Sequence, residues 1–260
     1  MRRNIMRKIF IILSAVLLLS ACNRSEEIKQ KEDKKIITVS AAASLKDALN
    51  EIEQKYEKKH QTIDLKFNYG ASGTLAQQIK SGAPVDIFIS AAEDKVDMLV
   101  EDKKINKEEK KSLLKNHLVL ISNTPINNIQ DLTSNKVEKI ALGNPELVPA
   151  GAYGKQMLEN ADLYQKLENK YILTKDVRQV LTYVETGNVE AGIVYASDLK
   201  SSEKIKYSFT IKDTLHDKII YPVAIIKDTH HKEEAQKFFD YVAQPDTLKI
   251  FEKYGFDPII

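Results

Sequence analysis

The feature that most constrains the fold of this 260-residue chain is a repeated alternation of short apolar runs with amphipathic helical patterns. Apolar residues at 45, 49, 52 and 56 recur at helical spacing, as do those at 177, 180, 181 and 184. Strands that are separated by helices and read as nearly continuous apolar runs predict an α/β fold with parallel sheets. The expected strands are 36–39, 63–67, 86–89, 117–121, 139–142, 191–195 and 219–226.

The N-terminus carries a targeting pattern that has to be separated from the fold. A basic segment with Arg2, Arg3, Arg7 and Lys8 precedes an apolar stretch over residues 9–21. That stretch is too short to cross a bilayer but has the length of a secretory signal. The pattern predicts a signal peptide over residues 1–21.

The signal ends in Leu19-Ser20-Ala21-Cys22, which resembles the lipobox of bacterial lipoproteins. The resemblance implies cleavage before Cys22 and a diacylglyceryl group on its sulfur. The alternative, a buried lone cysteine, fits poorly with a position directly after the apolar stretch. Two acyl chains on one residue meet the requirement for stable anchoring, so we expect a lipid-anchored protein on the extracytoplasmic face of the cell membrane.

Residues 22–35 read as a tether, because 23–35 contain one large apolar side chain, Ile28. The body that begins at Ile36 has roughly 225 residues, enough for one large or two small domains. Removing the four signal cations takes the formal charge from +2 to −2, and no basic stripe points to nucleic acid. The Lys–Glu mixture over 101–111 is typical of a solvated helix face.

Two apolar runs, around 118 and 222, flank a middle block with strands and helices of its own. A chain that leaves one lobe, builds another and returns needs two such crossings. We therefore expect one lobe from residues 36–118 and 223–260, and a second lobe from residues 119–222.

Two uncharged serine turns follow strand patterns and open helical ones: Ala41-Ala42-Ala43-Ser44-Leu45 and Gly70-Ala71-Ser72-Gly73-Thr74. A serine at such a place presents its hydroxyl beside the free amides of a helix N-terminus, which suits an anion. The plainer interpretation makes Ser44 and Ser72 ordinary N-caps, with Asp47 as the capping partner of Ser44.

Three later positions have the same character. Ala150 and Gly151 follow Pro149 at a predicted helix start, where their amides suit an anion, although this is also common helix punctuation. Val177 opens the next helix behind Asp176, a good N-cap in its own right. Tyr195 closes a strand, at the end where open α/β sheets bind ligands, but a tyrosine there is often core.

The enzymatic motifs that can be tested fail. The turn at Ser72 has Thr74 where a nucleophile elbow needs glycine, and Gly151–Lys155 does not have the spacing of a P-loop. The adjacent His230 and His231 lack the spacing and the Cys or carboxylate partners of a zinc site.

Five motifs, in order along the chain, together resemble the molybdate-binding proteins of ABC transporters, and the resemblance spans residues 36–260. The first runs from 41–45 through 70–74 to 81–91, and the others are 143–151, 176–178, 192–195 and 221–224. The family often has aspartate where this chain has Asn144. The resemblance implies the type II periplasmic-binding fold, in which two α/β lobes close on a tetrahedral oxyanion.

The resemblance also implies a ligand set: Ser44 and Ser72 through hydroxyl and amide, Ala150 and Val177 through their amides, and Tyr195 through its phenol. A fully deprotonated oxyanion offers only acceptors, so a cage of donors without a carboxylate suits it. Helix N-termini, each equivalent to about half a positive charge, balance the anion. Molybdenum enters only as the bound oxyanion, with no direct metal ligands and no cofactor.

The expected function is that of a non-enzymatic receptor that captures molybdate, and also tungstate, for an ABC permease and its ATPase. The chain is expected to work as a monomer. Within the class, a tungstate-selective or sulfate-like receptor stays open, because size selection is not encoded in the donor set. Outside it, a cell-surface serine hydrolase using Ser72 and a structural lipoprotein without a ligand remain as alternatives.

Overall fold

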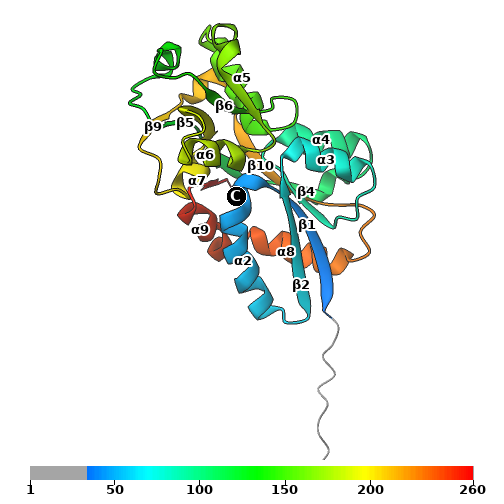
Figure 1. Cartoon of the computed structure of the whole chain (residues 1–260). Coiled ribbons are helices and arrows are strands. Elements are labelled where there is room, and N and C mark those ends of the chain that lie inside the picture. Colours follow the sequence, from blue (N-terminus) through cyan, green and yellow to red (C-terminus); the bar gives the residue numbers. More distant parts are fainter. Residues whose placement is uncertain (1–33, 260) are drawn as a thin grey trace, which may run out of the picture. The chain divides into compact units, whose positions relative to one another are not determined.

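The computed structural model of the protein describes residues 34–259, which build two β-sheets with helices on both faces (Figure 1). The six-stranded sheet has the order β11-β4-β10-β3-β1-β2 and, with its helices, is called the first lobe here. Its strands are β1 Lys35–Ala42, β2 Ile63–Gly70, β3 Ile87–Ile89, β4 Lys110–Asn116, β10 Ile219–Ile225 and β11 Asp257–Pro258.

Helices pack on both faces of the first sheet, since neighbouring residues of β3 enter different cores. Ile87 and Ile89 belong to a core with α2, α8 and α9, while Phe88 packs with α3 and α4. The helical segments are η1 Ala43–Leu45, α2 Lys46–Lys59, α3 Ser72–Lys80, α4 Glu93–Glu101, η2 Lys107–Glu109, α8 Lys232–Val242 and α9 Pro245–Lys253.

The five-stranded sheet, in the order β7-β6-β8-β5-β9, is the centre of the second lobe. Its strands are β5 Leu118–Ser122, β6 Ile140–Gly143, β7 Tyr171–Thr174, β8 Ala191–Tyr195 and β9 Tyr207–Thr210. Its helical segments are η3 Ile129–Thr133, α5 Pro149–Asn160, η4 Gln165–Lys170, α6 Val177–Glu185, α7 Ala196–Lys200 and η5 Asp213–Leu215.

Consecutive residues of β8 show that α5 and α6 lie on opposite faces of the second sheet. Ile193 packs beneath Gly154 of α5, whereas a Cβ on Gly192 would lie 2.6 Å from Val180 of α6. Because successive strand residues point to opposite faces, the two helices sandwich the sheet. Gly192 is therefore small because α6 lies directly on the strand.

The chain passes between the sheets twice, and both crossing strands run antiparallel to their neighbours. Between β4 and β5 stands the single residue His117, and the return runs from β9 into β10. β5 is antiparallel to β8 and β9, and β10 to β3 and β4, whereas β1, β2 and β3 are parallel, as are β6, β7 and β8. The parallel sheets expected from the sequence are thus found only in part, and both sheets are mixed.

Two further expectations differ from the structure. Of residues 101–111, only Glu101 belongs to α4; the segment then turns through η2 and enters β4 at Lys110, so it is not a helix face. Strands β4, β7, β9 and β11 were not expected, because they are short or carry polar residues where they are exposed. Such strands give no clear period in the sequence.

The signal, the tether before Lys34 and Cys22 lie outside the described residues. Among the helices from residue 34 onward, none is long and apolar enough to cross a membrane.

Candidate functional site

The two serine turns lie side by side because their strands are parallel neighbours. Ala42 at the end of β1 pairs in register with Gly70 at the end of β2. The chain then enters η1 with Ser44 and α3 with Ser72 at its first position. The carboxyl ends of parallel strands share one edge of a sheet, the usual place for ligands in α/β folds.

The second lobe repeats this arrangement. Gly143 of β6 is in register with Thr174 of β7, and the following segments lead into α5 and α6. Ala150 is the second residue of α5, Val177 the first of α6, and Tyr195 the last of the neighbouring strand β8. All five predicted site residues thus stand at helix starts or at a strand end, as the sequence pattern indicates.

Contacts between the lobes bring these edges together. The amide of Gly73 donates to the carbonyl of Leu147, just before α5, over 3.0 Å. Arg178 Nη2 binds Asp47 Oδ2 over 2.5 Å, and η1 contacts both α6 and α7. The glycine in the Ser72 turn therefore serves the approach of the other lobe, because a Cβ on Gly73 would lie 2.6 Å from that carbonyl oxygen.

The five predicted residues are buried, and each carries a backbone amide or, in Tyr195, a phenol that has no acceptor among the described residues. Each is 4% exposed or less. Between described residues, no backbone hydrogen bond outside helices and strands starts at the amide of Ser44, Ser72, Ala150 or Val177. Tyr195 Oη has no hydrogen-bond partner among these residues either. Buried amides without an acceptor are rare in folded proteins, so this set of donors indicates a site for an acceptor-rich ligand.

The hydroxyl of Ser72 has a hydrogen-bond partner that leaves its proton to donate, whereas the hydroxyl of Ser44 pairs with another hydroxyl. Ser72 Oγ accepts from the Ala91 amide over 2.9 Å, so its own hydrogen is free. Ser44 Oγ lies 2.9 Å from Tyr221 Oη. Burial raises the pKa of the Tyr195 phenol well above its usual value, which keeps it protonated as a donor.

The interpretation as ordinary N-caps fails for the two serines and holds for Asp176. Ser44 lies inside η1 and Ser72 inside α3, and neither side chain makes an N-cap hydrogen bond, so the plain N-cap interpretation is wrong for both. Asp176 does cap α6, accepting from the amide of Gln179 over 2.9 Å. That bond leaves the Val177 amide free.

One buried carboxylate lies near this cluster of donors. Asp198 Oδ2 accepts from the Tyr195 amide over 3.2 Å, and Oδ1 lies 3.5 Å from Arg178 Nη1. Burial raises the pKa of Asp198 to about 6, against the opposing effect of Arg178. This carboxylate binds Arg178, which in turn holds Asp47 of the first lobe.

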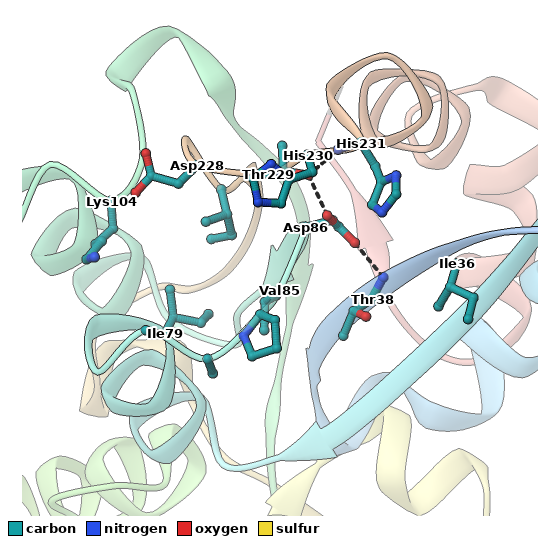
Figure 2. A pocket seen from close by; sticks show the side chains of 14 residues that line it. Ile36, Thr38, Ile79, Val85, Asp86, Lys104, Asp228, Thr229, His230 and His231 are labelled. Carbon is teal, nitrogen blue, oxygen red and sulfur yellow. Dashed lines mark hydrogen bonds between the residues drawn. The ribbon is translucent and has the colours of Figure 1, made fainter.

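A separate cavity of about 440 Å³ lies in the first lobe, beside the start of β1 (Figure 2). His230 and His231 line it, and Asp86 is already used by the Thr38 amide and the Thr229 hydroxyl. No group of three or more His, Cys, Asp or Glu suited to a metal ion occurs among residues 34–259. This cavity contains none of the five predicted site residues.

A nucleophilic role for Ser72 lacks a base. In the described part of the chain, the one hydrogen bond recorded for its hydroxyl comes from the Ala91 amide. Two of the histidines are engaged elsewhere, since His117 binds Asp213 and Asp257, and His60 stacks on Tyr56. Serine activation needs a base within hydrogen-bond reach, so the geometry favours a binding site.

Residues outside the predicted set complete the surroundings of the site. Tyr221 of β10 contacts Ser44, and Asn116 of β4 contacts Tyr221. Gly73, Asp47 and Arg178 join the lobes. The motif at 221–224 and the Asp176-Val177-Arg178 stretch were noted in the sequence, but they carried no signal of these contacts.

Two α/β lobes that meet over buried amides and a phenol, with no acceptor for them among the described residues, are the arrangement expected of a solute-binding receptor. The chain belongs to the bacterial extracellular solute-binding proteins, whose family model matches residues 37–257. Residues 6–23 match the prokaryotic membrane lipoprotein lipid attachment site, so the protein is lipid-anchored on the extracytoplasmic face. Members of this family are transport receptors, and the chain is accordingly a binding protein and not an enzyme.

Relatives and solved structures agree with this assignment. YvgL of Bacillus subtilis is 47% identical over 248 residues, which cover 94% of this chain and 95% of YvgL. The molybdate-binding protein ModA of Escherichia coli is 36% identical over 230 residues, covering 85% and 88%. The periplasmic molybdate-binding protein of Azotobacter vinelandii matches with a TM-score of 0.79 at 22% identity, covering 85% and 98%, and supports the fold.

Proposed function

We propose that this lipoprotein captures molybdate, and also tungstate, outside the membrane and delivers it to the permease and ATPase of an ABC importer. The observation that carries the proposal is the set of four buried amides and one phenol that have no acceptor among the described residues. A tetrahedral anion without protons supplies acceptors to all of them. The name of the 36% identical relative adds molybdate as the specific anion.

In this proposal Ser44 and Ser72 form one half of the cage, and Ala150, Val177 and Tyr195 form the other. Helix N-termini at these positions provide partial positive charge without any charged side chain contacting the anion. The expected lobe limits, residues 36–118 with 223–260 for lobe 1 and 119–222 for lobe 2, stay a proposal. Because β5 begins at Leu118 and β10 at Ile219, each crossing lies a few residues before those limits. Cys22 would carry the lipid, and the receptor would act as a monomer.

The first experiment is a thermal-shift series with molybdate, tungstate, sulfate and phosphate on the mature protein. A ligand at about 100 times its Kd adds roughly 2.7 kcal/mol to the free energy of unfolding. Stabilisation by molybdate supports the proposal. Stabilisation by tungstate or sulfate alone points to the other receptors of this class, and no stabilisation by any of them contradicts an oxyanion receptor.

The site is tested by calorimetry on Ser44→Ala, Ser72→Ala and Tyr195→Phe. Each removes one donor, and we expect each to weaken molybdate binding by about 1–3 kcal/mol. Ser81→Ala, at the exposed C-terminal end of α3, and Tyr56→Phe, which removes a buried hydroxyl within α2, serve as controls. Unchanged affinity in all three site variants would refute the assignment.

A further inference from the structure

The hydroxyl of Tyr221 lies between two buried polar side chains, one of which belongs to the proposed site. Tyr221 Oη is 2.9 Å from Ser44 Oγ and 3.2 Å from Asn116 Nδ2. Asn116 is the last residue of β4 and Tyr221 lies on β10, so both come from the strands at which the chain crosses between lobes. Tyr221 is fully buried, and Ser44 and Asn116 are each 4% exposed.

The direction of this hydrogen-bond chain follows from a backbone group. The amide of His117 lies 2.9 Å from one side-chain atom of Asn116. A backbone N–H can only donate, so that atom must be the oxygen, and the nitrogen must face Tyr221 and Ser197. Asn116 therefore donates to Tyr221 Oη.

The hydroxyl of Tyr221 in turn donates to Ser44. The amide nitrogen of Asn116 cannot accept, so the acceptor that the residues from 34 to 259 place within hydrogen-bond distance of the Tyr221 hydrogen is Ser44 Oγ. Burial raises the pKa of Tyr221 well above its usual value, which keeps the hydrogen in place. Ser44 Oγ then accepts a hydrogen bond from the Tyr221 hydroxyl, and the hydrogen of the Ser44 hydroxyl points away from Tyr221.

We propose that Asn116 and Tyr221 are positioning residues that orient the Ser44 hydroxyl as an obligate donor, so that this side of the site rejects oxyanions that carry a proton. This inference rests on the proposed function. Hydrogenphosphate and hydrogenarsenate need one acceptor in their site, because their hydrogen would otherwise face another donor. Ser72 reaches the same state by a simpler means, since the Ala91 amide occupies its acceptor side.

The decisive variant is Asn116→Asp, which has nearly the same shape and reverses the chain. One carboxylate oxygen still accepts from the His117 amide, while the other faces Tyr221 and can only accept. The Tyr221 hydrogen then turns to the introduced carboxylate, Tyr221 accepts from Ser44, and the lone pairs of Ser44 face the anion. We expect molybdate affinity to fall more than a hundredfold.

The new negative charge would weaken anion binding by itself, so the variant is measured again in a Tyr221→Phe background. Phenylalanine keeps the ring but cuts the chain between Asn116 and Ser44. We expect the fold-loss of molybdate affinity caused by Asn116→Asp to be at least ten times smaller in this background than in the wild-type protein. Equal losses in both backgrounds would overturn the proposal, because they would show an effect of charge alone.

Tyr221→Phe alone provides a second measurement. It frees Ser44 to rotate, so we expect about tenfold weaker molybdate binding and a smaller ratio of molybdate to phosphate affinity at pH 7.5. Tyr56→Phe is the matched control, because it removes another buried hydroxyl and should change neither quantity. A wild-type Kd and affinity ratio in Tyr221→Phe would also overturn the proposal.

The same measurements separate a failure of the proposed function from a failure of the orienting role. If the wild-type protein binds no oxyanion, the proposed function is refuted. If the wild-type protein binds molybdate, but Tyr221→Phe leaves the affinity unchanged or Asn116→Asp costs the same affinity in both backgrounds, only the orienting role is refuted. Circular dichroism and the Tm of each variant identify loss of folding. If either Asn116→Asp or Tyr221→Phe does not fold, the other of these two variants and the control Tyr56→Phe still decide the outcome.

Discussion

The turns at Ser44 and Ser72 have the same local design but meet the second lobe in different ways. At Ser72 the contact is made by the backbone, from the Gly73 amide to the Leu147 carbonyl, with no room for a side chain. At Ser44 it is made by side chains, through the ion pair of Asp47 with Arg178. The two hydroxyls repeat the contrast, since one is held by the Ala91 amide and the other by Tyr221.

This difference separates a fixed contact from an adjustable one. A backbone hydrogen bond keeps its geometry whatever the neighbouring side chains are, and it fails only when the chains cannot approach. A partly exposed ion pair depends on salt and pH and is worth little by itself. We therefore expect changes on the Ser72 side to be larger and less sensitive to conditions than changes on the Ser44 side.

The largest effect is expected for Gly73→Ala. Its Cβ would lie 2.6 Å from the carbonyl oxygen and 3.0 Å from the Cα of Leu147, so the lobes would have to move apart. We expect a loss of about 3 kcal/mol in molybdate binding, at the upper end for overpacking because backbone is displaced. Gly70→Ala in the same turn is the control, since its Cβ would meet Leu75 at an ordinary 3.4 Å. Calorimetry that finds both variants alike would contradict the fixed contact.

The buried carboxyl behind Arg178 gives the second prediction. The pKa of Asp198 is raised from 3.8 to about 6, mainly by burial, so the folded protein holds a proton that the unfolded chain releases. Stability should therefore fall by roughly 2–3 kcal/mol as the pH rises from about 4 to about 6. Urea unfolding of the ligand-free protein at several pH values measures this decline. In Asp198→Asn this fall in stability between about pH 4 and about pH 6 should be absent. A variant with the same pH profile as the wild type would rule the explanation out.

A smaller effect is expected for Asp47→Asn, which weakens the adjustable contact. The side chains of Arg178 and Asp47 are 26% and 32% exposed, so the pair should contribute about 0.5–1 kcal/mol to molybdate affinity, less at high salt. Asp64→Asn breaks an ion pair with Lys66 within β2 and should leave binding unchanged. Titrations at low and high salt test this, and a salt-independent loss would argue against an electrostatic contact.

The smallest effect concerns His117, the residue between β4 and β5. Its Nδ1 lies 3.2 Å from Asp213 Oδ1 and its Nε2 lies 2.9 Å from Asp257 Oδ2. Burial lowers its pKa, but the hydrogen bonds to the two carboxylates outweigh this and leave the pKa raised. Its contribution to stability is thus full below about pH 6.5 and is lost as the pH rises through the folded pKa. His117→Gln should cost a few tenths of a kcal/mol at about pH 5.5 and less at about pH 8.5. A Tm difference that is equal at both pH values would contradict this.

The sequence was a good guide wherever the information was local. Residues 44, 72, 150 and 177 stand at helix starts and Tyr195 at a strand end, because turn residues and apolar spacing determine these positions. The direction of β5 and β10 was not accessible in this way. Both strands read as continuous apolar runs, and such a run looks the same whether its neighbours are parallel or antiparallel.

The site could be predicted as a set of positions but not as a network. Tyr221 lies 177 residues from Ser44 along the chain, and Asn116 lies 105 residues from Tyr221. Neither spacing nor periodicity reports such pairs, because they arise only when the crossing strands are placed beside η1. Asp198 was missed for the same reason, since its partner Arg178 belongs to another helix.

The donors that find no acceptor within residues 34–259 also bear on how a transporter could recognise a loaded receptor. Bringing the lobes together around these groups without an anion would strip water from several donors at once, at about 1–3 kcal/mol each. An anion removes that penalty, so under the proposed function occupancy and closure become linked equilibria. The closed population would then act as a signal of cargo, and a permease that binds the closed lobes would not be occupied by empty receptors.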